Sequence, residues 1–158
     1  MKKYELTEET KVISGKTLFR IRALRSFGDI KAGDLGGFIE NERNLSHEGN
    51  AWVGDNAQVG GNAQVGGDAW VDGDAWVNGD GLINSNNDYL CEQGLGSRNR
   101  SASFFKCKDG HIHVLCGCFS GNLDEFENKV KEEHGNSKYA KEYLGFIEVV
   151  KTHFEVRQ

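Results

Sequence analysis

The sequence contains no proline among its 158 residues, and none of its apolar runs is long enough to span a bilayer. Its amino terminus, Met-Lys-Lys-Tyr-Glu-Leu, lacks the apolar core of a secretory signal, so we expect the protein to stay in the cytoplasm, away from membranes. Basic residues are also few, 19 against 24 acidic ones, and the formal net charge of −5 argues against a surface for bulk nucleic acid.

Glycine, in contrast, is abundant, with 21 residues. A glycine excess without proline indicates a backbone with many tight turns rather than a disordered linker. The length suits one moderate hydrophobic core, or two small ones.

Four cysteines are present, namely Cys91, Cys107, Cys116 and Cys118. Disulfides, a metal site and buried thiols are the alternatives. Asp109-Gly110 predicts a two-residue hairpin turn, which pairs Cys107 with Ile112. One face of this hairpin then carries Phe105, Cys107, Ile112, Val114, Cys116 and Cys118, and the other carries Lys106, Lys108, His111 and His113. Because thiols and imidazoles diverge in this register, the sequence predicts buried free thiols and no metal site.

Residues 50–79 consist of five hexads in one register. They read Asn-Ala-Trp-Val-Gly-Asp, Asn-Ala-Gln-Val-Gly-Gly twice, Asp-Ala-Trp-Val-Asp-Gly and Asp-Ala-Trp-Val-Asn-Gly. In each hexad the alanine stands two residues before the valine, so both point to the same side of an extended segment. A fixed six-residue period predicts a parallel β-solenoid with three hexads per coil, and that side is its interior.

The period extends weakly beyond these five hexads. Upstream, Ile39 and Leu45 fall in the alanine register, and downstream the pattern ends after Ile83. Residues 11–24 alternate enough to predict strands that cap the open end of the solenoid. We therefore expect N-terminal strands in residues 1–27, the solenoid in residues 28–85 and a separate unit in residues 86–158.

The hexads resemble those of the hexapeptide-repeat family, and the resemblance implies a left-handed parallel β-helix. Many members of that family are acyltransferases or γ-type carbonic anhydrases. The carbonic anhydrases hold a metal with several histidines on neighbouring coils, whereas His47 is the single histidine of this segment. His47 is a candidate base for acyl transfer, yet no long insertion interrupts the hexads to bind coenzyme A.

Three tryptophans occupy outward positions between alanine and valine, namely Trp52, Trp70 and Trp76. Since three hexads make a coil, Trp52 and Trp70 are expected on one face of adjacent coils and Trp76 on the next face. Large aromatic side chains that point outward are costly to expose, so we expect another protein surface to bury them. We predict a homo-oligomer interface, a trimer by resemblance, with burial under the C-terminal unit as the alternative.

The C-terminal unit has the pattern of a small antiparallel sheet with two helices. Strands are expected at residues 88–93 and in a hairpin spanning 104–119. Asn122 followed by Glu125 predicts a capped helix over 123–134 that stops at Gly135, and an apolar stripe predicts a second helix over 138–154. The fold class predicted for the whole chain is thus a short left-handed β-helix followed by this α/β unit.

A turn with glycines and arginines precedes the hairpin, and it is a candidate for anion binding. Its candidate ligand-binding residues are Gly96, Ser97, Arg98 and Arg100, with Phe104 off the core face to stack on a base. The segment 116–121 before the first helix is a second possible anion site. The alternative for both is an ordinary surface turn.

Three motifs together resemble small proteins encoded by bacteriophages and prophages: Gly36-Gly37-Phe38-Ile39-Glu40, the hexads, and Cys116-Gly117-Cys118-Phe119-Ser120-Gly121. The resemblance implies a non-enzymatic binding protein, without catalytic residues or cofactor, that sequesters a nucleotide-like ligand or a host defence protein. The alternatives are an acyltransferase-like enzyme using His47 and a structural module of the virion.

Overall fold

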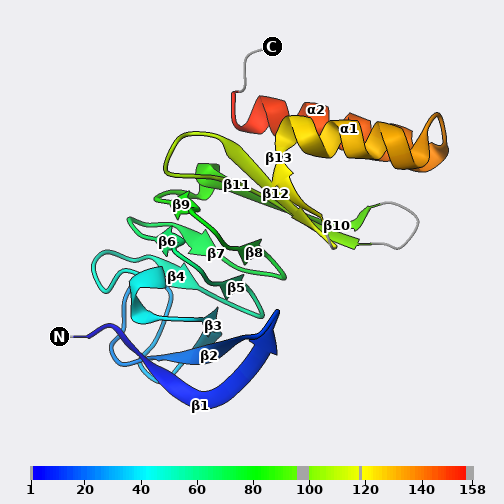
Figure 1. Cartoon of the computed structure of the whole chain (residues 1–158). Coiled ribbons are helices and arrows are strands. Elements are labelled where there is room, and N and C mark those ends of the chain that lie inside the picture. The colour runs from blue at the N-terminus through cyan, green and yellow to red at the C-terminus, as the bar shows by residue number, and fades with distance from the viewer. Residues whose placement is uncertain (1, 96–99, 118, 156–158) are drawn as a thin grey trace. The chain divides into compact units, whose positions relative to one another are not determined.

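The structure is a computed structural model that describes residues 2–95, 100–117 and 119–155. The chain divides into two compact units, Met1–Asn86 and Asn87–Gln158 (Figure 1). Each unit has its own hydrophobic core, and each is described separately below.

The first unit begins with three antiparallel strands, β1 (Tyr4–Ile13), β2 (Lys16–Ala23) and β3 (Leu35–Ile39). After the short 3₁₀ helix η1 (Glu42–Asn44) come six two-residue strands: β4 (Trp52–Val53), β5 (Gln58–Val59), β6 (Gln64–Val65), β7 (Trp70–Val71), β8 (Trp76–Val77) and β9 (Leu82–Ile83). One sheet has the order β1-β2-β3-β5-β8, so the N-terminal strands extend a ladder that continues into the hexads.

Parallel pairing joins hexads that lie eighteen residues apart. Trp52 pairs with Trp70, Gln58 with Trp76, and Gln64 with Leu82. The alanines and valines of the five hexads are buried, each at most 1 % exposed, so they form the interior of this unit. Pairing at eighteen residues is what a coil of three six-residue segments requires.

The sixth position of each hexad turns the corner between two strands. Asp55, Gly61, Gly67, Gly73 and Gly79 all have positive φ, between 49° and 66°. Glycine adopts this left-handed conformation without steric cost, and aspartate tolerates it better than most residues. The chemistry of this one position explains why the chain turns every six residues.

Upstream of the hexads the register differs from the sequence prediction. Ile39 pairs with Val59, and Leu45 bridges to Val65, so both residues occupy valine positions rather than alanine positions. The prediction was wrong because two additional residues lie between Leu45 and Val53, in the segment that contains His47.

The second unit consists of a four-stranded antiparallel sheet with two helices. Its elements are the 3₁₀ helix η2 (Asn86–Asp88, which begins at the unit boundary), β10 (Tyr89–Leu95), β11 (Arg100–Lys106), β12 (Ile112–Cys116), β13 (Phe119–Asn122), α1 (Leu123–His134) and α2 (Lys138–His153). The helices lie side by side over one face of the sheet (Figure 1). Their predicted bounds are confirmed to within one residue, and Asn122 and Glu125 form the predicted capping box. Neither helix is long and apolar enough to cross a membrane.

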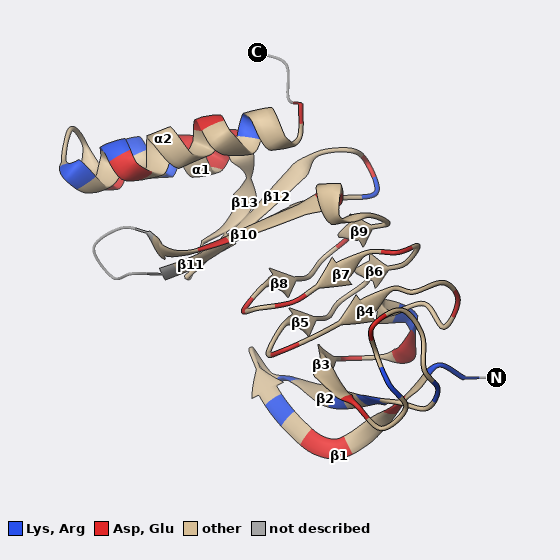
Figure 2. Ribbon diagram, turned by 180° about the vertical axis from the view of Figure 1, so that it is seen from behind, with Lys and Arg blue, Asp and Glu red and all other residues tan. Residues whose placement is uncertain are grey.

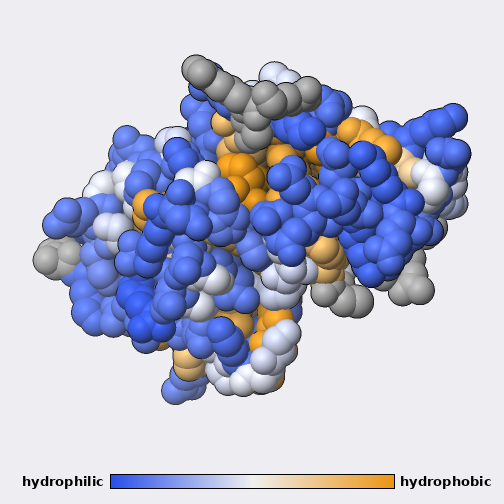
Figure 3. Space-filling model, turned by 45° about the horizontal axis from the view of Figure 1, so that its top comes forward, coloured by the Kyte–Doolittle hydropathy of each residue, from blue (hydrophilic) through white to orange (hydrophobic). Residues whose placement is uncertain are grey.

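Charges of both signs are interspersed along the two helices (Figure 2). Lys151 of α2 lies 3.2 Å from Glu127 of α1, and Lys131 contacts the other oxygen of the same carboxylate. The Lys151 ammonium lowers the pKa of Glu127, and this pairing links the outer edges of the two helices. Most of the visible surface is hydrophilic (Figure 3).

The β11–β12 hairpin has a three-residue turn instead of the predicted two-residue turn. The Cys107 amide donates to the His111 carbonyl, and the Gly110 amide donates to the Cys107 carbonyl, each at 2.9 Å. Lys106 therefore pairs with Ile112, and Phe105 with His113. A one-residue change of register moves the side chains of β11 to the other face relative to those of β12. The predicted faces were therefore wrong for β11: Phe104 joins Ile112 and Val114 in the core, whereas Phe105 and Cys107 lie on the face of His113.

Candidate functional site

His47 is the candidate catalytic base of the first unit, and its imidazole is held on three sides. Its Nδ1 accepts a hydrogen bond from the Lys3 amide at 3.1 Å, and its Nε2 lies 3.1 Å from a Glu42 carboxylate oxygen. Its ring stacks on Tyr4, with 4.2 Å between centroids. The Tyr4 hydroxyl in turn donates to the Leu45 carbonyl at 2.6 Å.

These contacts determine the tautomer of His47. Because Nδ1 accepts from a backbone amide, the ring proton lies on Nε2 and is donated to Glu42. The Lys2 ammonium, followed by His47, lowers the pKa of Glu42, so this carboxylate is ionised and suited to accept that proton. Both ring nitrogens are thus engaged, and the imidazole fastens the N-terminal strand to the segment after η1.

Parallel pairing of the hexad strands positions the three tryptophans, and their side chains differ in burial. Trp52 and Trp70 are paired neighbours, and Trp76 lies on a different ladder. Trp52 is only 2 % exposed and packs edge-on against Phe27 of the same unit. Its predicted place in a subunit interface was wrong, because the N-terminal segment covers its ring. Trp70 and Trp76 are half-buried, and the Trp70 indole donates to the Asn50 carbonyl.

The predicted ligand-binding turn falls largely outside the described residues. Gly96, Ser97 and Arg98 are not described, and for Arg100 only the backbone strand is. Phe104 is described, and it is fully buried against Phe126 and Phe146 in the core of the second unit. The prediction that Phe104 stacks on a ligand was wrong, because the shifted register turns this side chain toward the helices.

The start of α1, the second possible anion site, is closed by the chain itself. The Asn122 side chain accepts from the Glu125 amide at 2.8 Å, and the Glu125 carboxylate accepts from the Asn122 amide. A carboxylate of the chain thus occupies the position where an external anion would bind.

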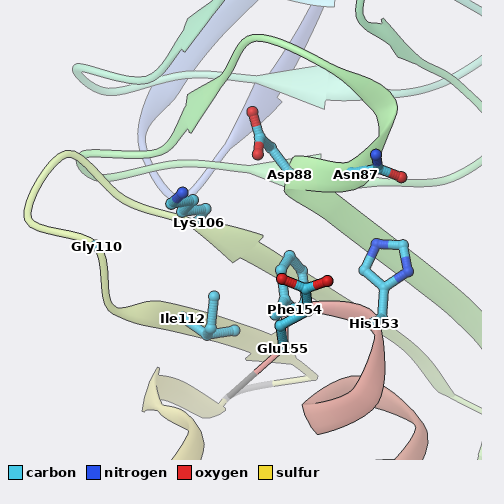
Figure 4. A pocket seen from close by; sticks show the side chains of 8 residues that line it. All are labelled: Asn87, Asp88, Lys106, Gly110, Ile112, His153, Phe154 and Glu155. Atoms are coloured by element: carbon cyan, nitrogen blue, oxygen red, sulfur yellow. The ribbon is translucent and has the colours of Figure 1, made fainter. Parts of the chain in front are cut away.

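The second unit contains a cavity of about 620 Å³ beside the β11–β12 turn (Figure 4). Its lining comes from η2, the hairpin and the end of α2, and consists of Asn87, Asp88, Lys106, Gly110, Ile112, His153, Phe154 and Glu155. His153 donates through Nε2 to the Tyr89 carbonyl at 3.1 Å, which holds its ring in place. Cavities of this size are typical of small-molecule sites.

The lining of the cavity combines apolar and charged groups. Ile112 and Phe154 supply an apolar wall, whereas Lys106 is opposed by the carboxylates of Asp88 and Glu155 (Figure 4). With two acidic groups and one ammonium, this lining suits a neutral or cationic ligand with hydrogen-bonding groups better than a polyphosphate. Sequence reasoning missed this site, because its residues come from three separate segments.

The described cysteines do not share one environment. Cys116 is buried in the core beneath the helices, as the prediction of a buried thiol has it, and Cys91 is partly exposed. Cys118 lies outside the described residues. Cys107 lies on the opposite face, where its sulfur and ring nitrogens of His111 and His113 all lie within 4.8 Å of one another. The predicted divergence of thiol and imidazoles was therefore wrong for Cys107.

Both histidines of this cluster are oriented by neighbouring side chains, one in the hairpin turn and one on β13. A carboxylate oxygen of Asp109 lies 2.5 Å from Nδ1 of His111, and Ser120 Oγ lies 2.9 Å from Nε2 of His113. Hydrogen bonds from the backbone and then the side chain of His111 lower the pKa of Asp109. Burial, followed by the neighbouring His111, lowers the pKa of His113, which favours its neutral ring.

No known protein-family model matches the chain. Over 63 aligned residues it is 38 % identical to the uncharacterized acetyltransferase YdcK of Escherichia coli (strain K12). The aligned part makes up 35 % of this chain and 19 % of YdcK, so the chain spans about a fifth of the length of that protein. The similarity supports the repeat-protein nature of this chain.

Proposed function

We propose that this protein is a non-enzymatic binding protein in which the hexads form a short left-handed β-helix as a rigid scaffold and the second unit holds a small polar ligand. The observation that carries the proposal is the cavity lined by Lys106, His153 and Asp88. It combines an apolar wall with converging polar groups, which is the usual composition of a ligand site.

The state of His47 favours binding over catalysis in the first unit. A general base needs an unprotonated nitrogen that reaches the substrate. In His47 that nitrogen accepts from the Lys3 amide, and Tyr4 covers one face of the ring. Freeing this imidazole would break the contacts that fasten the N-terminal strand.

Acyl transfer is the second candidate, and the similarity to the acetyltransferase YdcK over 63 residues is compatible with it. It predicts that the full chain binds coenzyme A and that His47→Gln abolishes acetyl transfer while the fold is retained. The binding proposal predicts instead that His47→Gln lowers thermal stability and that coenzyme A leaves the melting temperature unchanged.

In its more specific form, the proposal is that the protein acts for a phage inside a bacterial host. A phage-type counter-defence protein would sequester a nucleotide-like ligand or a host protein, and a homo-oligomer would bury Trp70 and Trp76. The charges of the cavity favour a nucleoside-like ligand over a nucleoside triphosphate.

The test is native mass spectrometry of the full chain purified from bacterial cells, before and after denaturation. We expect a retained small molecule that is lost in Lys106→Ala. Lys108→Ala is the matched control, since Lys108 lies on the same hairpin but outside the cavity lining. A protein that carries no small molecule, or that keeps it equally in both variants, would overturn this assignment of the cavity.

A further inference from the structure

We propose that the β11–β12 hairpin is a binding site for a zinc-type divalent metal ion, with Cys107, His111 and His113 as ligands. The site does not depend on the function proposed above. Cys107 follows β11 directly, His111 precedes β12, and the three-residue turn between them brings the side chains to one face. All three potential ligand atoms lie within 4.8 Å of one another.

The separation of the two imidazoles fits a shared metal ion. Nε2 of His111 lies 3.4 Å from Nδ1 of His113. Two nitrogens bound tetrahedrally to zinc, each at about 2.0–2.1 Å, are about 3.3 Å apart. The rings thus stand close to the spacing that a metal requires, and the Cys107 sulfur lies within 4.8 Å of a ring nitrogen of each histidine.

The remaining nitrogen of each ring is held by a second residue. Nδ1 of His111 donates to Asp109, and Nε2 of His113 lies beside Ser120 Oγ. In protein metal sites, a ligating histidine almost always directs its other N–H to a carboxylate, a carbonyl or water, which sets its tautomer and orientation. Asp109 and His111 already have the arrangement of a carboxylate–histidine–metal triad.

The donor set indicates the class of metal. One thiolate and two imidazoles suit zinc and its neighbours, whereas calcium and magnesium prefer oxygen ligands. On binding, the Cys107 thiol releases its proton to solvent; because Nδ1 of His113 binds the metal, the ring proton of His113 lies on Nε2, where it is donated to Ser120. Three protein ligands leave a fourth position for water or an external donor group.

Zinc binding is measured with the full, reduced chain by calorimetric titration, and the ligands are identified by cobalt(II) absorption. We expect one ion per chain, tetrahedral cobalt bands in the visible, and a thiolate-to-cobalt charge-transfer band. His111→Ala should abolish tight binding without unfolding the protein, because the His111 ring is exposed. Cys107→Ser should remove the charge-transfer band.

Two further variants separate direct from indirect effects. Asp109→Asn should weaken zinc affinity by about 10–100-fold, as expected for the loss of a carboxylate that orients a ligand. Cys91→Ser is the matched control and should leave affinity and spectrum unchanged, since Cys91 lies outside the cluster. Octahedral cobalt spectra, or zinc affinity that survives His111→Ala, would overturn the assignment.

Discussion

The five hexads of the first unit repeat the same interior residues, whereas the β11–β12 hairpin of the second unit is aligned by a single turn. In the hexads every alanine and valine indicates the same register, so the five copies together specify it even where a single hexad is ambiguous. In the hairpin, a turn of three residues instead of two moves the side chains of β11 to the other face relative to those of β12. The repeated hexads therefore allow the strand register of the first unit to be predicted from sequence, whereas the single turn of the hairpin leaves the register of the second unit ambiguous.

The same contrast explains where the candidate chemistry lies. The interior of the hexads is filled by buried alanines and valines and offers no polar side chain from these positions. The hairpin places Cys107 and His113 together with Phe105 on one face, and Phe104, Ile112 and Val114 on the face that packs beneath the helices. The cluster of Cys107 and the two histidines depends on the register of the hairpin, so the sequence alone did not predict it.

The substitution with the largest expected effect is Phe104→Ala. Phe104 is fully buried beneath the helices, so we expect a loss of about 3–5 kcal/mol in the free energy of unfolding of the second unit. Both helices belong to this unit, so its unfolding is followed by the far-ultraviolet helix signal. A loss below about 1 kcal/mol would indicate the register predicted from sequence, with Phe104 away from the core.

The corners of the hexads are tested by Gly67→Ala and Gly73→Ala. Both glycines have positive φ, so alanine should cost about 1–2 kcal/mol at either position. At Gly67 the added methyl group would also collide with the backbone oxygen of Asn84, whereas at Gly73 it would meet open space. Gly67→Ala should therefore be the more destabilising of the two.

Tryptophan fluorescence measures this difference, because all three tryptophans belong to the first unit. Gly73→Asn is the control, and it should cost less than Gly73→Ala, since asparagine tolerates the left-handed conformation. Equal losses for the two alanine variants would contradict the corner geometry.

The capping box at the start of α1 is tested by Asn122→Ala. Asn122 caps α1 and accepts from the Glu125 amide, so its removal should lower stability by about 1 kcal/mol. Asn128→Ala, on the exposed side of the same helix, should leave stability almost unchanged. Similar effects of the two substitutions in urea unfolding would count against the capping box.

The smallest expected effect on stability comes from the hydrogen bond between the Lys3 ammonium and the Ala51 carbonyl in the first unit. Burial lowers the pKa of the Lys3 ammonium from 10.5 to about 8, and this ammonium donates to the Ala51 carbonyl at 2.5 Å. Between pH 8 and 10 the unfolded chain thus binds more protons at Lys3 than the folded one, so stability should rise with pH. Burial raises the pKa of Tyr4, which reverses the trend above pH 10.

The measurement is the difference in unfolding free energy between the protein and Lys3→Met at pH 8 and pH 10. We expect the protein to gain about 0.5–1 kcal/mol relative to the variant, because hydrogen bonds to the ammonium and solvent screening reduce the full effect. The variant serves as the reference for all other titrating groups. A difference that stays constant would mean that Lys3 keeps its ordinary pKa, and a difference that reverses would mean that folding raises this pKa.

The sequence by itself determined the features that depend on neighbours along the chain. Among these are the extent of the hexads, the inward direction of Ala63 and Val65, and the helix that begins after Asn122. Each follows from periodicity or from a cap within four residues, and such signals need no knowledge of distant contacts.

Only the tertiary structure decided the features that depend on distant pairings. The turn before His111, the burial of Trp52 by Phe27 and the engagement of His47 by Lys3 all join segments whose alignment no local pattern specifies. A hairpin closes with two or three residues at similar cost, so packing of the apolar face against the helices selects the register. That selection turns Phe104 into the core and leaves Cys107 beside two histidines.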